Sequence, residues 1–169
     1  MRWVTHQVAA VAAALIIHLP PAGIAAAFVG GVLPDVFDQK IAGLSRDRQR
    51  AFNRVHRGVT HWFGLWLGVL ALSLVAPPGL PAEWFALWRP VCFGLALGGL
   101  SHVVLDMLTP QGVPLLPFSR RNRFSLRLCR TGGLGEYIFL AAMLVGMGLF
   151  LRQDIIVPLR ALRRVLFSW

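Results

Sequence analysis

The sequence has little charge, few acidic residues and almost no cysteine. Only 14% of its 169 residues are charged, and 56% are apolar, whereas charged residues make up roughly 25% of a typical soluble domain. This composition argues against a soluble domain and indicates a membrane protein. The two cysteines, Cys92 and Cys129, form no Cys-x-x-Cys pair, so we expect neither a disulfide framework nor a zinc ribbon.

Basic residues greatly outnumber acidic ones. The chain has 17 lysines and arginines but only 7 aspartates and glutamates, which gives a formal charge of +10 at pH 7. Such an excess can serve nucleic-acid binding, but membrane topology and contact with anionic headgroups explain it more simply in an apolar chain. We expect membrane lipids with anionic headgroups as the main partners, a cytoplasmic protein as an alternative and nucleic acid as the least favoured. The length fits one domain over 1–169.

Five apolar segments predict an all-α integral membrane bundle of about five short helices. Several are shorter than the roughly 20 residues that span a bilayer comfortably. Pro20-Pro21 and Pro77–Pro81 separate neighbouring helices. The first segment imitates a signal peptide, but it has no clear small-residue cleavage site and is expected to be retained. The segments are Val4–Leu19, Ala22–Leu33, Trp62–Ala76, Pro90–Leu108 and Leu134–Leu151.

Two basic loops predict the orientation. Gln39–Arg57 and Arg120–Arg130 fall on the same side as Arg2 when the segments are counted as crossings, and the positive-inside rule makes that side cytoplasmic. The chain is therefore expected to cross a membrane several times. The tail 152–169 alternates leucines and arginines like an amphipathic helix lying in the interface, and the count leaves its side open.

Ionisable residues converge on that predicted cytoplasmic side. His102 and Asp106 lie one helical repeat apart, so they share a helix face, and the helix should end near Thr109-Pro110. Ionisable residues within membrane segments usually mark functional sites. The other members are His6 at the start of the first helix, Asp35 and Asp38 at the end of the second, His56 and His61 at the start of the third, and Glu136 at the start of the fifth.

Histidine with aspartate suits zinc, manganese or iron. Asp35, His61, His102 and Asp106 can fill one site, and a bound metal of this kind acidifies water for hydrolysis. A histidine and an aspartate paired with each other or with backbone explain His102 and Asp106 equally well. A second metal can start from His6, sharing Asp106, with Asp38, His56 or Glu136 as further ligands, although Glu136 can simply cap its helix.

Neighbouring residues suggest supporting roles. Arg57 can hold an anionic oxygen bidentately. Thr60 is expected to cap the third helix, and Thr5 to orient His6. Gly94, Gly98 and Gly99 are expected to allow close helix packing.

Several motifs resemble those of a known family. They are Thr5-His6, Leu33-Pro34-Asp35, His56-Arg57-Gly58-Val59-Thr60-His61, Leu100–Pro110 and Gly112–Leu116. Together they look like the LexA-binding, inner-membrane-associated hydrolases, also called the YdjM-like or membrane-bound metal-dependent hydrolase family. That family is similar in turn to zinc-dependent phospholipase C. The resemblance implies an all-helical fold, one or two zinc ions held by His6, Asp35, His61, His102 and Asp106, and hydrolysis of a phosphoester.

The sequence departs from the family pattern at two places. Members commonly read Pro-Asp-x-Asp-His after the second helix, where this chain has Phe37 and Asp38 in the last two places. Either Asp38 substitutes as a ligand or a ligand position is lost. Trp62 stands where the family tends to have serine, and is expected to narrow the mouth of the site.

The resulting expectation is a membrane-bound hydrolase of a phospholipid-like phosphoester. Asp35 or Asp38 would steer the water, and Arg57 would hold the phosphate. The alternative is a non-catalytic membrane protein with a structural metal, whose basic loops dock a cytoplasmic partner such as a repressor or DNA. A transporter with a histidine and aspartate relay is less favoured because no inverted repeat is present.

Overall fold

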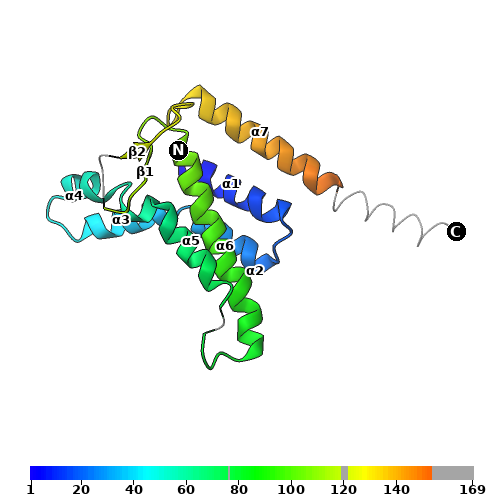
Figure 1. Ribbon diagram of the computed structural model, residues 1–169. Coiled ribbons are helices and arrows are strands. Elements are labelled where there is room, and N and C mark those ends of the chain that lie inside the picture. Colours follow the sequence, from blue (N-terminus) through cyan, green and yellow to red (C-terminus); the bar gives the residue numbers. More distant parts are fainter. Residues whose placement is uncertain (76, 119–121, 154–169) are drawn as a thin grey trace.

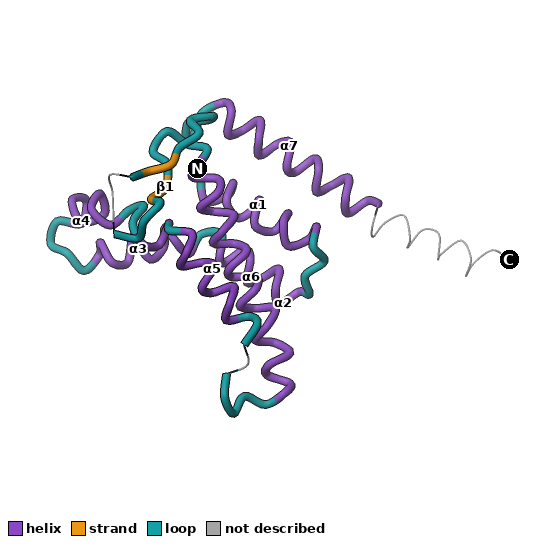
Figure 2. The backbone as a smooth tube through the Cα atoms, viewed as in Figure 1, coloured by secondary structure: helices purple, strands orange, loops and turns teal. Residues whose placement is uncertain are grey.

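The computed structural model describes residues 1–75, 77–118 and 122–153, and this part of the chain is mostly helical (Figures 1 and 2). The predicted all-α class is confirmed. The α-helices are α1 (Trp3–Ile16), α2 (Pro21–Gly30), α3 (Leu33–Gly43), α4 (Arg48–Val55), α5 (Phe63–Leu72), α6 (Ala82–Met107) and α7 (Leu134–Leu151). A 3₁₀-helix, η1 (Val59–His61), precedes α5, and two short strands, β1 (Val113–Pro114) and β2 (Arg123–Phe124), pair antiparallel.

Helix α6 is the centre of the bundle, with α1, α2 and α5 packed around it (Figure 1). The α2 backbone comes so close that a Cβ atom added at Gly94 would lie 2.1 Å from the carbonyl oxygen of Gly23. A Cβ atom at Gly98 would lie 2.3 Å from the carbonyl oxygen of Ala27. Only glycine fits at these positions, so the predicted close packing is confirmed.

The apolar core is split into two small clusters. One consists of Ala10, Ala14 and Ala27 and joins α1 to α2. The other cluster consists of Trp66 from α5, Val103 from α6 and Val113 from β1. Both clusters contact α6, directly or through partly buried leucines, and they hold the C-terminal half of α6 in a fixed position.

Two described helices, α6 and α7, are long and apolar enough to cross a membrane. A third span results if α2 and α3, which meet at a 47° bend, count as one. α1 and α5 are apolar but shorter. The five predicted apolar segments are thus present as helices, and two or three spans among them are long and apolar enough to cross a membrane. Only 6% of the apolar window in α7 is buried, as expected for a helix surrounded by lipid.

The chain breaks between α2 and α3, which corrects the predicted second segment. α2 ends at Gly30, and α3 begins at Leu33 with Pro34 in its first turn, where proline is favourable because its fixed φ suits the helix start. Asp35 and Asp38 therefore lie in the first half of a new helix. They do not close the second one.

The predicted polar loop at 39–57 is largely helical. α3 continues to Gly43, and α4 begins after Asp47, whose side chain accepts a hydrogen bond from the backbone N–H of Arg50. Such an N-cap stabilises a short helix that has no apolar core of its own. No residue of α4 is buried. Its sequence therefore has no apolar run from which a helix could be predicted.

Two further helix starts differ from the prediction. α6 begins at Ala82, just after Pro81, and includes Pro90, because one missing backbone hydrogen bond is tolerated in a long apolar helix. α5 begins at Phe63 with Trp62 as its N-cap residue, so Thr60 is not the cap. The predicted end of α6 before Thr109 and the bounds of α7 are both confirmed.

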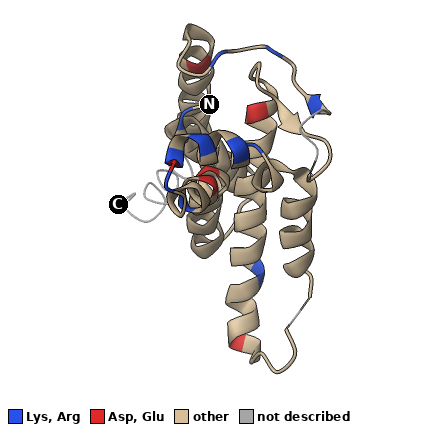
Figure 3. Cartoon of the chain, turned by 90° about the vertical axis from the view of Figure 1, so that its left-hand side faces the viewer, with Lys and Arg blue, Asp and Glu red and all other residues tan. Residues whose placement is uncertain are grey.

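Charge is distributed unevenly over this fold. Figure 3 shows few charged residues along the α5–α6 hairpin and more of them around its opposite end, where α3 and α4 lie. The predicted amphipathic tail lies outside the described residues from 154 onward, as do Arg120 and Arg121.

Candidate metal centre

The structure brings together all five residues predicted to bind a metal. His6 comes from α1, Asp35 from α3 and His61 from η1, while His102 and Asp106 come from the last two turns of α6. The three imidazoles have no exposed surface, Asp106 is 1% exposed and Asp35 is 9% exposed. Four separate segments therefore bury their metal-ligating groups at one point.

His61 and His102 have the spacing of metal ligands with each of two carboxylates, Asp35 and Asp106. The Nε2 atoms of His61 and His102 are 3.2 Å apart, and Asp35 Oδ1 lies 3.4 and 3.7 Å from them. Asp106 Oδ2 lies 3.5 Å from His61 Nε2 and 3.7 Å from His102 Nε2. Ligands about 2.0–2.1 Å from a tetrahedral zinc ion are roughly 3.4 Å apart. Either carboxylate oxygen, together with the two histidine nitrogens, therefore has the spacing of ligands around one such ion. We call these four atoms the four-atom set.

The hydrogen bonds assign the tautomers of both central histidines. His102 Nδ1 lies 2.8 Å from the carbonyl oxygen of Gly31, which can only accept, so Nδ1 carries the proton. The Thr60 hydroxyl donates to Asp38 and lies 3.0 Å from His61 Nδ1, so His61 Nδ1 is also the protonated nitrogen. Two Nε2 lone pairs then face each other, and either a metal cation or a shared proton between them would remove their repulsion.

Two more groups lack hydrogen-bond partners within the described structure. Asp35 Oδ2 accepts from Trp3 Nε1 at 3.0 Å, but the buried Oδ1 has no donor, and neither nitrogen of His6 has a partner. Unpaired polar atoms in buried positions are rare and costly. A cation contacting Asp35 Oδ1 would remove that cost.

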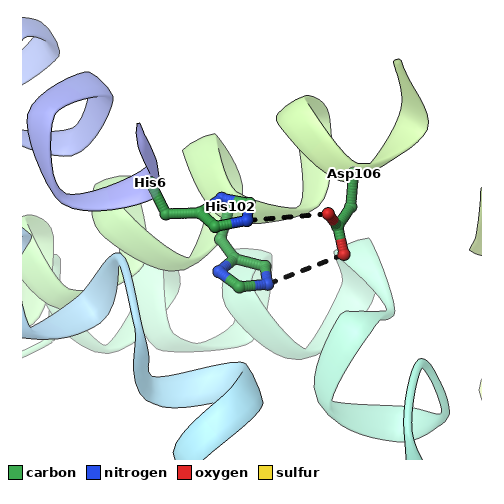
Figure 4. A group of neighbouring side chains, drawn as sticks. All are labelled: His6, His102 and Asp106. Carbon is green, nitrogen blue, oxygen red and sulfur yellow. Dashed lines mark ion pairs between the residues drawn. The ribbon is translucent and has the colours of Figure 1, made fainter. Parts of the chain in front are cut away.

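His6 lies next to this set rather than inside it. Figure 4 shows His6 stacked on His102 and facing Asp106, with His6 Nε2 3.6 Å from Asp106 Oδ1. His6, His102 and Asp106 form one group that could hold a metal. Asp106 Oδ1 also accepts from the α-amino group of Met1 at 2.9 Å. A second cation here would share Asp106 with that ammonium group.

Asp35, His56 and His61 form a second group that could hold a metal, and it overlaps the four-atom set. His56 Nδ1 lies 3.7 Å from Asp35 Oδ1 but nearer, at 3.2 Å, to Asp38 Oδ2. We assign priority to the four-atom set because its histidine nitrogens are free of hydrogen bonds to other groups, whereas His56 Nδ1 contacts Asp38.

Asp38 supports the histidines rather than facing the metal position. Its carboxylate accepts from the Thr60 hydroxyl at 2.6 Å and from the backbone N–H of Arg57 at 3.1 Å, and it lies 3.5 Å from His61 Nδ1. Carboxylates in this position fix the orientation of a ligating imidazole. The structure thus places Asp38 behind His61, on the side away from Asp35 Oδ1.

Arg57 is buried and largely engaged by protein groups. Its backbone is left-handed, with φ 57°, and its guanidinium contacts Asp106 Oδ2 at 3.0 Å, the Thr109 hydroxyl at 2.9 Å and the Gly112 carbonyl at 3.0 Å. Only Nε lacks a partner in the described part of the chain. The guanidinium therefore orients Asp106, and the predicted contact with a phosphate would fall to Nε.

Glu136 lies in neither metal-binding group. Its carboxylate accepts from the backbone N–H groups of Arg2 and Gly132 and from the Thr5 hydroxyl, so it links the start of α7 to α1. Thr5, expected to orient His6, is engaged by Glu136 instead. Neither cysteine belongs to either of the two groups that could hold a metal. Burial, with a smaller contribution from Glu136, raises the pKa of the Cys129 thiol.

A small cavity of about 160 Å³ gives access to the centre. Trp62 is not among its lining residues: the indole donates to the Leu115 carbonyl, so the expectation that it narrows the mouth is not met. Sequence reasoning missed Gln111, Thr131 and the indole donor Trp3, for which no motif gave a signal. The lining consists of Met1, Asp35, His56, Arg57, Asp106, Gln111 and Thr131.

Fold and site together define a helical membrane protein with buried histidine and aspartate clusters that could hold a metal. The family model described as YdjM inner membrane protein matches residues 1–166 of the chain. The chain belongs to this family, which confirms that part of the resemblance seen in the motifs.

Two curated relatives are similar over much of the chain. They are the inner membrane protein YdjM of Escherichia coli (strain K12) and the inner membrane protein YdjM of Shigella flexneri. Each is 36% identical over 121 residues, which is 68% of this chain and 59% of the relative. The matched region thus spans about three fifths of the length of these relatives. No solved structure matches the chain.

Proposed function

We propose that this protein is a membrane-bound, metal-dependent hydrolase of a phosphoester. The observation that carries the proposal is the 3.2 Å contact between His61 Nε2 and His102 Nε2, two nitrogens whose protons lie on the opposite side of each ring. Asp35 and Asp106 complete the shell around the same point. This donor set of nitrogen and oxygen suits zinc.

The proposed ligands of the first metal are Asp35, His61, His102 and Asp106. His6 would contribute to a second ion that shares Asp106, as its two unpaired nitrogens suggest. A bound zinc ion supplies Lewis acidity and an acidified water.

The chain's own residues hold and orient these ligands. Thr60 and Asp38 keep the His61 proton on Nδ1, and Arg57 holds Asp106. Asp35 lines the access cavity, so in this proposal it steers the attacking water, the role that sequence reasoning shared between Asp35 and Asp38. Asp38 has both oxygens engaged by protein donors and is assigned to positioning.

The proposed location is the bacterial inner membrane, with several crossings and the metal centre on the cytoplasmic side. The apolar helices and the name of the curated relatives, inner membrane protein YdjM, support this membrane location. The lysine and arginine residues of α3 and α4 support a cytoplasmic position for this end of the molecule. A phospholipid-like substrate fits this setting because it would reach the centre from the lipid, and anionic headgroups are the proposed lipid partners.

A structural metal is the second candidate, and one observation favours it. The two histidines have two carboxylates beside them, and four protein ligands would close a tetrahedral shell, as in structural zinc sites, whereas catalytic sites keep an open position. In this case the basic segments would dock a cytoplasmic protein. The cavity that reaches Asp35 and Asp106 and the unpaired His6 favour catalysis.

Metal analysis of the detergent-purified full chain, followed by a phosphodiesterase assay, tests both candidates. We expect at least one zinc ion per chain and hydrolysis of bis-p-nitrophenyl phosphate. His102→Ala should abolish both, and His18→Ala, at a histidine outside either metal group, should change neither. Stoichiometric zinc without hydrolysis of this or a phospholipid substrate would support the structural candidate. Absence of bound metal would overturn both.

A further inference from the structure

A second, larger concavity lies between α3, α4 and the segment that follows β1. Its volume is about 390 Å³, within the roughly 300–1,000 Å³ of typical ligand sites. It shares no lining residue with the access cavity of the metal centre. The lining is mainly apolar, and we call it the α3–α4 groove: Asp38, Ile41, Arg54, Val55, Gly58, Val59, Thr60, Pro117 and Phe118.

Apolar side chains are exposed in and beside this groove. Phe118 is 90% exposed and Ile41 is 50% exposed, while Leu44, one helical turn after Ile41, is 91% exposed. Large apolar side chains gathered in this way mark a surface that meets lipid or a partner. Because two described helices are long and apolar enough to cross a membrane, lipid acyl chains are an apolar medium available to this surface.

Positive charge borders the same groove. The Arg54 guanidinium lines it and makes no ion pair or hydrogen bond within residues 1–75, 77–118 and 122–153. Lys40, Arg46 and Arg48 lie on the same α3–α4 hairpin, where Asp47 is already paired with Arg50. An apolar slot with an unpaired guanidinium is complementary to an amphiphile that carries an anionic head.

We infer that the α3–α4 groove binds the acyl chain of an anionic membrane lipid, with Arg54 holding the headgroup. A soluble anion would leave the apolar lining unused, and an uncharged lipid would leave Arg54 unpaired. The inference does not rest on hydrolysis, because the groove lies on the Nδ1 side of His61 and the metal position lies on the Nε2 side.

Occupancy of the groove would reach the metal centre through two residues. Asp38 and Thr60 line the groove, and both contact His61 Nδ1. A bound lipid therefore touches the residues that set the tautomer of a proposed metal ligand, which makes the site suited to sensing the surrounding bilayer.

Photolabelling of the full chain tests the inference. The protein is delipidated in an uncharged maltoside detergent and titrated with phosphatidylglycerol carrying a diazirine on its acyl chain. We expect saturable labelling at Ile41, Val59 or Phe118, and weaker labelling by the matching phosphatidylcholine. Arg54→Gln should weaken phosphatidylglycerol binding by about tenfold, the loss of one charged hydrogen bond. Arg89→Gln, at an exposed position of α6 outside the groove and its basic border, should leave it unchanged.

A filled groove provides an independent variant. Val59→Trp should prevent labelling at Ile41 and Phe118 while the helical circular dichroism is retained. If that variant fails to fold, the exposed Arg54→Gln change still decides the outcome. Equal labelling by both lipids that ignores Arg54→Gln, or labelling confined to α7, would overturn the inference. A groove protected only when two copies associate would also overturn it, in favour of a protein interface.

Discussion

The candidate metal centre and α7 are held in place by different means. The centre is built from four segments whose polar groups are buried. Its histidines are oriented by hydrogen bonds, from His61 to the Thr60 hydroxyl and from His102 to the Gly31 carbonyl. α7 is fastened at its start by Glu136 and is otherwise almost unburied. Directional bonds therefore determine the geometry of the centre, whereas lipid contact has to stabilise most of α7. Breaking each kind of support should have different consequences.

The largest effect is expected from Arg57→Gln. This change leaves the buried Asp106 without its guanidinium partner and should lower the free energy of unfolding by about 3–5 kcal/mol. Zinc affinity should fall by roughly 10- to 100-fold, because Arg57 orients a proposed ligand. Chemical denaturation and zinc titration calorimetry measure the two quantities.

Arg50→Gln is the matched control for that change. Its ion pair with Asp47 is exposed to solvent, so stability and zinc affinity should stay near those of the parent protein. If both variants behave alike, Arg57 is not part of the support of the centre.

A smaller effect, confined to the other region, is expected from Glu136→Ala. The buried carboxylate accepts three hydrogen bonds, and leaving these donors unpaired should cost about 1–3 kcal/mol. Hydrogen exchange should accelerate at the start of α7 and at the amide of Arg2, while zinc content stays constant. Loss of zinc would instead return Glu136 to the metal ligands, as one sequence-based alternative had it.

The smallest effect is expected from Thr60→Val, which removes a hydroxyl at nearly constant volume. Without that hydroxyl, the proton on His61 Nδ1 loses its nearest acceptor, and zinc affinity should fall by roughly tenfold. Thr60→Ser keeps the hydroxyl and should restore the parent affinity. Equal affinities for the valine and serine variants in the same titration would contradict the tautomer assignment.

Local sequence patterns predicted a large part of this fold. The bounds of α7, the end of α6 and the proline break after α1 all follow from apolar runs and prolines, which act within a few residues. α4 and the first eight residues of α6 were missed. α4 has no buried residue, and Pro90 looked like a helix boundary although the helix continues through it.

The clustering of the candidate ligands was predictable to a similar extent. The spacing of His102 and Asp106 follows from helix geometry alone, and the motifs pointed to His6, Asp35 and His61. The roles of Arg57, Asp38 and Thr5 were not predictable in the same way, because each depends on which distant group the side chain meets. The Arg57 guanidinium, for example, donates to Asp106, Thr109 and Gly112, which lie about 50 residues further along the sequence.

The sequence by itself determined that this chain is helical, apolar and equipped with histidines and aspartates of metal-binding type. It did so because helix periodicity, composition and side-chain chemistry are local properties. Only the tertiary structure decided which nitrogen of each imidazole is free and which carboxylates face it. Those choices depend on hydrogen bonds between segments far apart in the chain, set by the close approach of α2 to α6 at Gly98.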